Sequence, residues 1–272
     1  MREFRQIAAF IHSEAGISLP DSKRSLVYSR LTKRLRALKL QSFKDYCDVI
    51  EDHTNQDERR ELLSALTTNV TNFYREPHHF EDLKSNVAPR LIEKAKAGGR
   101  VRVWSAACSS GQEPYTIALT FLSLAKNIAD YDFRILATDI DPAIVQTAKN
   151  AQYHQSLLTN VPKKELSSFF NQTGDDLYQP NDSVRSLVSF KEMNLIADWP
   201  VKGPFDVIFC RNVVIYFDTE TEETVWGKFA DKLADGGHLY IGHSERITGP
   251  ATNVLTPSGV TAYTKNASLT VR

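Results

Sequence analysis

The segment SAACSSGQEP at residues 105–114 carries residues whose types and spacing suit ligand binding. Its small side chains let the backbone approach a ligand closely. The G-x-G-x-x-G spacing of nucleotide binders is missing. Its absence argues against a loop that binds a pyrophosphate and favours contact with the smaller edge of a cofactor. Glu113 supports this interpretation, because a carboxylate repels phosphate and attracts an amino group. The alternatives are a tight turn that binds nothing, and a Glu113 that only stabilises the first turn of a helix.

A second acidic residue, Asp139, ends an apolar run further along the chain. Acidic side chains at that position accept hydrogen bonds from ribose hydroxyls. Asp139 could instead cap a helix, but Asp141 before Pro142 already supplies a cap. Two acidic positions around a nucleoside, without a phosphate-binding loop, indicate S-adenosylmethionine rather than NAD.

Histidines and cysteines do not have the spacing of a metal site. His78-His79, His238 and His243 form no H-E-x-x-H motif, so we expect no metal. His243 ends a predicted strand on the ligand side, which places it near the pocket. The cysteines form no C-x-x-C pair, which predicts reduced thiols at Cys47, Cys108 and Cys210.

The elements that must position these residues alternate between strands and helices after residue 100. The strand-like runs are RVRVWSA, FRILATDID, FDVIFCRN, GHLYIGHSE and TAYTKN. This alternation predicts a largely parallel, doubly wound sheet. Between about Tyr153 and Asn194 it lapses into a helix, VPKKELSSFF, and a turn region, QTGDDLYQPND. Strand-like LY and SLVSF flank that turn, and we interpret them as an inserted hairpin.

The first 75 or so residues have helical spacing instead. Apolar residues recur at three and four positions in Phe4, Ile7, Ala8 and Ile11, and again in Leu26, Leu31, Leu35 and Leu38. The second of these helices is opened by Pro20-Asp21-Ser22 and is basic, with no acidic residue among Lys23, Arg24, Arg30, Lys33, Arg34, Arg36 and Lys39. The segment TTNVTNFYREP at residues 67–77 interrupts the helical period, so we expect the junction there.

Composition excludes some classes of protein. The 272 residues include 33 basic and 33 acidic side chains, and this balance argues against a generally cationic nucleic-acid binder. No apolar run approaches the roughly 18 residues of a membrane span, and the N-terminus is unlike a secretory signal. We therefore expect a cytoplasmic protein without membrane insertion.

Five ordered motifs, TTNVTNFYREPHHF, SAACSSGQEPYT, ATDID, FCRNVVIYFD and GHSE, resemble the chemotaxis receptor glutamate O-methyltransferases, the CheR family. The resemblance implies an all-α N-terminal domain (1–68), a junction and linker helix (69–99), and a Rossmann-like S-adenosylmethionine-dependent domain (100–272). A small antiparallel β subdomain would be inserted at about 155–192. The sequence departs from the usual GCSTGEEP at Ala107 and Gln112, but Glu113 and the loop length are intact.

The resemblance also implies the residues of the site. Arg75 and Tyr216 would be the catalytic pair, although Arg75 could instead be a surface arginine paired with Glu76, and Tyr216 a buried aromatic. S-adenosylmethionine, released as S-adenosylhomocysteine, would contact Asn69, Thr71, Arg75, Glu113, Asp139, Asn194, Leu195, Arg211 and Asn212.

By the same resemblance, the acceptor is a receptor glutamate. A glutamate carboxylate is ionised at neutral pH, so the site needs to align the reactants and needs no general base. The partner would be the cytoplasmic helical region of chemotaxis receptors, and we expect a monomeric enzyme that binds no nucleic acid. Substrate docking is expected at Lys23, Arg24, Arg30, Lys33, Arg34 and Arg36.

Two alternatives stay open. A methyltransferase of this fold could act on a small molecule or RNA, because a fold does not fix a substrate. The chain could also be a non-catalytic, receptor-binding adaptor. The neutral charge and the absence of an amino-methylation motif argue against RNA, and an intact Arg75, Glu113, Asp139 and Tyr216 argue against an adaptor. Cys210 lacks the neighbouring proline of cytosine-carbon methyltransferases.

Overall fold

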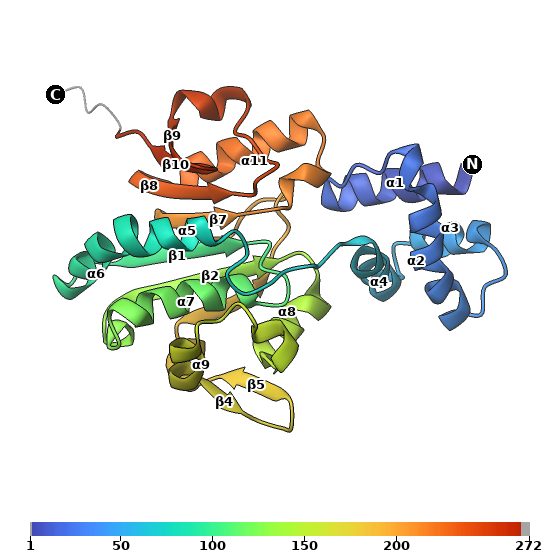
Figure 1. Ribbon diagram of the computed structural model, residues 1–272. Coiled ribbons are helices and arrows are strands. Elements are labelled where there is room, and N and C mark those ends of the chain that lie inside the picture. Colours follow the sequence, from blue (N-terminus) through green and yellow to red (C-terminus); the bar gives the residue numbers. More distant parts are fainter. Residues whose placement is uncertain (1, 268–272) are drawn as a thin grey trace.

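The computed structural model describes residues 2–267, which form a helical N-terminal part beside an α/β part (Figure 1). The helices of the first part are α1 (Arg2–Ala15), α2 (Arg24–Ala37), α3 (Phe43–Glu51) and α4 (Gln56–Leu66). Their apolar faces enclose a core of their own, which includes Phe4, Ile7, Ile11, Val27, Leu31 and Tyr46. The helical prediction for this part of the chain is confirmed.

Helix α2 buries a different stripe from the one that we expected. Val27 and Leu31, four residues apart, are buried, whereas Leu26 is 45% exposed and Leu38 37% exposed. Leu31 and Leu35 follow the helical i, i+4 spacing, and Leu35 packs against the same core, but Leu26 lies five positions before Leu31 and so points to another side, and Leu38 follows the last residue of α2. Leu26 turns toward the second part of the molecule instead, where it borders a cavity.

A seven-stranded sheet forms the centre of the second part, in the order β6-β2-β1-β7-β8-β10-β9. The first five are parallel, and β10 pairs in antiparallel fashion with both β8 and β9. This confirms the Rossmann-like fold class. The strands are β1 (Val101–Ala106), β2 (Phe133–Asp139), β6 (Val188–Glu192), β7 (Phe205–Cys210), β8 (Leu233–Ile241), β9 (Leu255–Gly259) and β10 (Ala262–Lys265).

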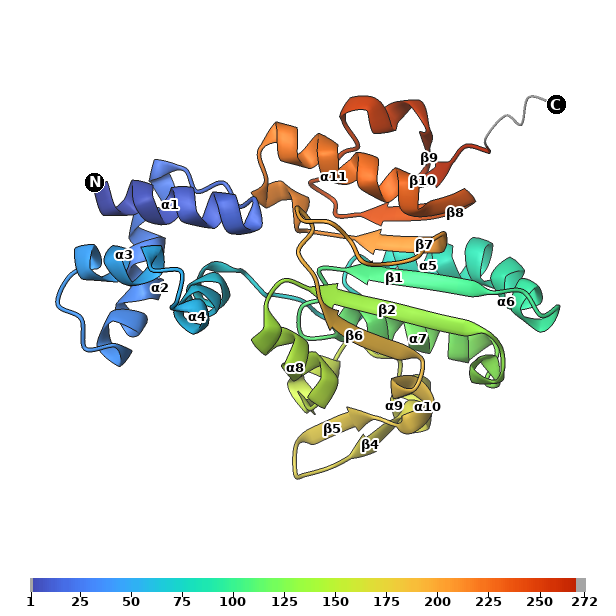
Figure 2. The same cartoon turned by 180° about the vertical axis from the view of Figure 1, so that it is seen from behind.

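Helices cover both faces of this sheet (Figures 1 and 2). Helices α5 (Pro77–Asp82), α6 (Ala88–Lys96) and α7 (Gln112–Leu124) pack on one face and share a core with it. Helix α11 (Thr219–Lys232) packs on the other face, where Trp226 and Phe229 contact the second core. Helix α8 (Pro142–Asn150) follows β2. None of the helices in residues 2–267 is long and apolar enough to cross a membrane.

The inserted β subdomain is present, but its strands differ from our interpretation. Strand β5 (Leu177–Pro180) pairs with β3 (Tyr153–His154) and with β4 (Phe170–Gln172), which directly follows α9 (Lys163–Phe169). The run SLVSF is not the hairpin partner of LY. It enters β6, which pairs in parallel with β2 after the short helix α10 (Asp182–Arg185). The sequence pattern of such a short strand does not indicate which sheet the strand joins.

The parallel strands all end at the edge of the sheet that faces the helical part (Figure 2). Ligands of open α/β sheets bind outside this carboxyl edge. The loops that follow β1, β2, β6 and β7 therefore meet the N-terminal helices and the junction at one place.

Candidate active site

A cavity of about 410 Å³ lies between the helical part and the carboxyl edge of the sheet, within the usual size range of small-molecule sites. The structure brings together every residue that the sequence predicts for the cofactor and for catalysis. They line this one cavity: Asn69, Thr71, Arg75, Glu113, Asp139, Asn194, Leu195, Arg211, Asn212 and Tyr216.

Glu113 enters the cavity from the first turn of α7 and is held from two sides. One carboxylate oxygen accepts a hydrogen bond from Ser105 Oγ at 2.7 Å. The other accepts from Arg211 Nη1 at 2.9 Å. Burial raises the pKa of Glu113, although Arg211 and Ser105 oppose that rise. The carboxylate is thus a fixed acceptor inside the cavity rather than a solvated helix end.

Asp139 stands at the end of β2 and has a separate role from Asp141. Its two oxygens accept backbone N–H groups, from Ser109 at 2.8 Å and from Asp141 at 3.1 Å. Asp141 caps α8 as expected, accepting the N–H of Ala143 at 3.0 Å. Burial raises the pKa of Asp139 to about 6, with the backbone hydrogen bonds opposing it. The lone pairs that remain on Asp139 can accept hydrogen bonds from ligand hydroxyls.

Arg211 is a buried cation in the wall of the cavity that binds several neighbouring groups. It pairs with Glu113 and with Glu76, at 3.3 Å from its Nη2 to Glu76 Oε2, and it donates to the backbone carbonyl of Arg75. Burial alone would raise the pKa of Glu76. Arg211 and hydrogen bonds from His243 and Asn212 outweigh burial and lower this pKa to about 2. Arg211 therefore keeps Glu76 ionised.

This arrangement leaves Arg75 without a carboxylate partner in the described part of the chain. The alternative pair of Arg75 with Glu76 is not formed, because Arg211 takes Glu76. One Arg75 nitrogen, Nη1, donates to the carbonyl of Val70 at 2.8 Å. The other N–H groups of the guanidinium can bind an incoming carboxylate in its planar, two-pronged geometry.

Strained backbone gathers around the cavity. Positive φ values occur at Tyr74 (55°) and Glu76 (56°), on either side of Arg75, and at Ala107 (62°), Ser109 (50°) and Asn212 (59°). Each such non-glycine residue costs on the order of 1 to 3 kcal/mol and persists only where its surroundings hold it. Ala107 takes the left-handed conformation at the position where the resembled family usually has glycine, which explains the usual residue physically.

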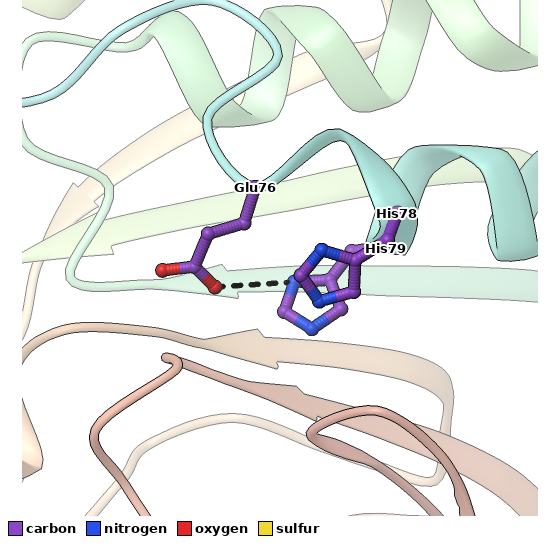
Figure 3. A group of neighbouring side chains, drawn as sticks. All are labelled: Glu76, His78 and His79. Atoms are coloured by element: carbon purple, nitrogen blue, oxygen red, sulfur yellow. Dashed lines mark ion pairs between the residues drawn. The ribbon is translucent and has the colours of Figure 1, made fainter.

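Glu76, His78 and His79 form the one group of potential metal ligands within residues 2–267, and their ligand atoms lie within 4.8 Å of one another (Figure 3). Glu76 Oε2 and His79 Nδ1 are 3.6 Å apart. The same Glu76 oxygen already pairs with Arg211, whose charge repels a metal cation. Burial, and then Arg211, lower the pKa of His79 to about 3. We therefore interpret Glu76 as the ion-pair partner of Arg211 rather than as a metal ligand. That the protein binds no metal stays a prediction.

Glu245 is a site residue whose role sequence reasoning missed. Its buried carboxylate accepts the backbone N–H groups of Asn212, Val213 and Val214 at 2.8 to 3.0 Å. It also accepts the N–H of Gly242 at 2.6 Å. Glu245 thereby fixes the loop that carries Asn212 and leads to Tyr216. The motif GHSE, an acidic residue three positions after a glycine at a strand end, was the available signal.

Three of the six cations expected to dock a substrate, Arg24, Arg30 and Arg34, have partners within the chain. Arg34 pairs with Glu58 at 2.6 Å and with Glu61 at 2.8 Å. Arg30 donates to the carbonyls of Leu66 and Thr67, which end α4. Arg24 pairs with Asp21 at 3.2 Å. The side chains of Lys23, Lys33 and Arg36 are exposed and have no partner among the described residues.

A parallel sheet with an antiparallel last pair of strands, and a cavity at its carboxyl edge that presents two carboxylates and no phosphate loop, define an S-adenosylmethionine-dependent methyltransferase. The family model for the "CheR methyltransferase, SAM binding domain" matches residues 69–264. The model for the "CheR methyltransferase, all-alpha domain" matches residues 2–67. The chain belongs to the CheR methyltransferase family, and its cofactor is S-adenosylmethionine.

Curated relatives agree with this assignment. A probable chemotaxis protein methyltransferase of Rhizobium etli is 53% identical over 256 residues, which are 93% of this chain and 96% of the relative. The chemotaxis protein methyltransferase of Salmonella typhimurium is 41% identical, over 90% of this chain and 84% of its own. A solved structure of an amino pentose methyltransferase from Micromonospora echinaspora covers 64% of this chain and 58% of its own, at 16% identity and a TM-score of 0.34.

Proposed function

We propose that the protein transfers the methyl group of S-adenosylmethionine to glutamate side-chain carboxylates of chemotaxis receptors. The observation that carries this proposal is the absence of a general base from the described wall of the cavity. No histidine is among the described residues that line it, and Glu113 and Asp139 hold internal hydrogen bonds and would use their remaining lone pairs for the cofactor. Burial raises the pKa of the Cys108 thiol well above its usual value. An acceptor that is already ionised, such as a carboxylate, suits such a site.

The residues present suit the cofactor. Carboxylates at Glu113 and Asp139 would accept hydrogen bonds from the amino group and the ribose hydroxyls, and Asn69, Thr71, Asn194 and Asn212 offer further polar groups around them. When bound, S-adenosylmethionine supplies an electrophilic methyl group on a cationic sulfur. The carboxylates of the cavity also favour this positive charge electrostatically.

Arg75 and Tyr216 would align the acceptor. Both border the cavity and are partly exposed, so an acceptor carboxylate can reach them from solvent. Arg75 would hold the carboxylate through the N–H groups not used by Val70, and the Tyr216 hydroxyl would orient the attacking oxygen. Alignment of this kind can supply several kcal/mol of the barrier reduction without any proton transfer.

Receptor docking would use the exposed cations of the helical part. Lys33 and Arg36 project from α2, and Lys23 from the turn before it, without partners among the described residues; Lys23 also lines the cavity. A helical segment rich in glutamate complements these charges. We therefore propose the cytoplasmic helical region of chemotaxis receptors as the partner, with these three residues as its docking charges.

Mass spectrometry of a receptor fragment after incubation with the protein and S-adenosylmethionine tests this function. We expect the added methyl group on glutamate side chains. Arg75→Ala should abolish the modification, because the acceptor loses its carboxylate clamp. Methylation of lysine, arginine or RNA, with unmodified glutamates, would contradict the proposal.

A further inference from the structure

Tyr216 lies in a short 3₁₀ turn, Val214–Tyr216, between β7 and α11. Glu245 holds the start of this loop from the α/β side. The other side of the turn is held by the helical part of the molecule. The backbone N–H of Ser18 donates to the carbonyl of Tyr216 at 2.7 Å, and Ile17 forms an antiparallel bridge with Phe217.

The end of α1 contacts the same region through side chains. His12 Nε2 lies 2.5 Å from Asp218 Oδ2, and Asp218 is the residue that caps α11. Asn194 Nδ2 donates to the carbonyl of Glu14 at 2.7 Å. Contacts thus run continuously from α1 to the segment Gly16–Ser18, which we call the strap.

Gly16 lets the strap lie this close. Its φ is +71°, and a Cβ atom there would stand 2.7 Å from Ile196 Cγ2 and 3.3 Å from Phe217 Cδ1. Real Cβ atoms do not approach other atoms to 2.7 Å, so any larger residue must move the strap or its neighbours. Gly236 has the same φ of +71° but would meet nothing within 4 Å, which makes it a matched control.

We propose that the strap is a positioning element for Tyr216, so that the helical part completes the active site as well as binding the receptor. The inference rests on the proposed catalytic role of Tyr216. Ser18 fixes the carbonyl of Tyr216, and the bridge fixes the next residue, which together set the direction from which the phenol enters the cavity. A displacement of about 1 Å at an aligning group can cost up to a hundredfold in rate.

Hydrogen–deuterium exchange tests the contact without cofactor or substrate. In Gly16→Ala, the amides of the strap and of the turn around Tyr216 should exchange faster than in the wild type, because the Ser18 hydrogen bond opens more often. Gly236→Ala carries the same backbone penalty and should leave both segments protected. Equal protection of the strap in wild type and Gly16→Ala would overturn the proposal.

Kinetics then test whether the contact acts through Tyr216. We expect Gly16→Ala to lower kcat by roughly tenfold or more with a much smaller change in cofactor affinity. In a Tyr216→Phe background, the same substitution should lower kcat less than about twofold further, because the group that the strap positions is gone. Independent, additive losses would show a general structural effect and contradict a positioning role.

Ser18→Pro provides a second variant in case Gly16→Ala does not fold. Proline removes the N–H that bonds Tyr216, whereas Ser18→Ala keeps it, so Ser18→Pro should show the larger loss of kcat. Equal kcat values in these two variants would count against the proposal. These measurements distinguish the two proposals. A normal kcat in Tyr216→Phe would contradict the catalytic role of Tyr216. A low kcat in Tyr216→Phe with a normal kcat in Gly16→Ala would contradict only the positioning role of the strap.

Discussion

Two carboxylates at the site, the half-buried Glu76 and the buried Asp139, have pKa values shifted in opposite directions. For Glu76, burial raises the pKa, but Arg211 together with hydrogen bonds from His243 and Asn212 outweighs burial and lowers the pKa to about 2. For Asp139, the partners are neutral backbone N–H groups, burial dominates, and the pKa rises to about 6. Glu76 therefore stays ionised at any physiological pH. Asp139, in contrast, gains or loses its proton close to the physiological pH range.

This difference predicts the pH dependence of cofactor binding. The ionised Asp139 accepts hydrogen bonds from hydroxyls, so affinity for S-adenosylmethionine should fall as the pH drops through about 6, by up to roughly tenfold per unit below it. Calorimetry between pH 5 and 8 measures it, and Asp139→Ala should remove the dependence. A wild-type affinity that is unchanged from pH 8 to pH 5 would contradict the assignment.

The same raised pKa affects folding with a definite sign. Asp139 binds its proton more tightly in the folded protein than in the unfolded chain, where its pKa is about 3.9. Its contribution to stability is therefore complete below that unfolded value and is lost as the pH rises through about 6. At neutral pH the ionised Asp139 thus favours cofactor binding, while its buried charge lowers the stability of the cofactor-free protein.

Ala107→Gly should stabilise the protein. The φ of Ala107 is 62°, which glycine adopts without the steric cost, and the gain should exceed the extra entropy of glycine by about 0.5 to 1 kcal/mol. Chemical denaturation measures the change. Ala97→Gly, at an ordinary φ of −76°, is the matched control and should be destabilising. A destabilised Ala107→Gly would show that contacts of the methyl group outweigh the strain.

The sequence alone indicated Glu113 and Asp139, because each lies at a local strand end or helix start, and the family resemblance supplied the other predicted residues that line the cavity. Sequence reasoning missed Glu76 and Glu245, whose roles depend on Arg211 and on the Asn212 loop, both distant in the chain. Arg34 shows the opposite case. It resembles a free cation within its own helix, and only the packing of α4 against α2 reveals its partner Glu58.

At the scale of elements, the site depends on loops held by buried polar groups. Glu245 is an example, since one carboxylate accepts four N–H groups at 3.0 Å or less. Charge-assisted bonds of this kind hold a strained loop at the end of a rigid strand. The loop in turn determines where Asn212 and Tyr216 stand.

Glu245→Gln should therefore destabilise the protein and weaken the site. The amide cannot accept all four N–H groups, because its NH₂ would face some of them, and each unsatisfied buried donor costs about 1 to 3 kcal/mol. Thermal unfolding should show this loss, while the exposed neighbour variant Ser244→Ala should not. A Gln variant as stable as the wild type would mean that the loop is held by other contacts.

The elements themselves were predictable to different degrees. The long helix α1 buries one periodic face, and the strands β1 and β7 are largely apolar runs buried on both faces of the sheet, so their patterns identify them. Strands β3 and β4 span two and three residues, too few for a pattern to appear. The sequence pattern places the run that forms β6 in the insert, because its position beside β2 is set by tertiary pairing alone.

At the scale of the whole molecule, the helical part is fixed on two sides of the cavity. The strap joins it to the Tyr216 turn, and Ser64 and Asn69 both donate to Asp141, at 2.9 and 3.1 Å. The cavity therefore has walls from both parts, and the exposed Lys23, directly before α2, is among the residues that line it. Docking and alignment would take place on one continuous surface.

Reversing Lys23, Lys33 and Arg36 to glutamate should raise the KM for receptor by roughly tenfold at low salt and flatten its salt dependence. Affinity for S-adenosylmethionine should be preserved. The same charge change at the exposed Lys126, Lys149 and Lys202 serves as the control. Arg34 is unsuitable for this test, because its reversal breaks the ion pair with Glu58. An unchanged KM at low salt, or tight nucleic-acid binding by the wild type at physiological salt, would contradict the docking role.

The base lability of the transferred methyl group decides whether the acceptor is a glutamate carboxylate. Receptor-containing membranes would be incubated with the protein and methyl-labelled S-adenosylmethionine, and the label then exposed to mild base. We expect label in the receptor that mild base releases, as a carboxyl methyl ester requires, and none when the acceptor glutamates are replaced by glutamine. Label that resists base, or that enters the glutamine-substituted receptor equally, would contradict glutamate O-methylation.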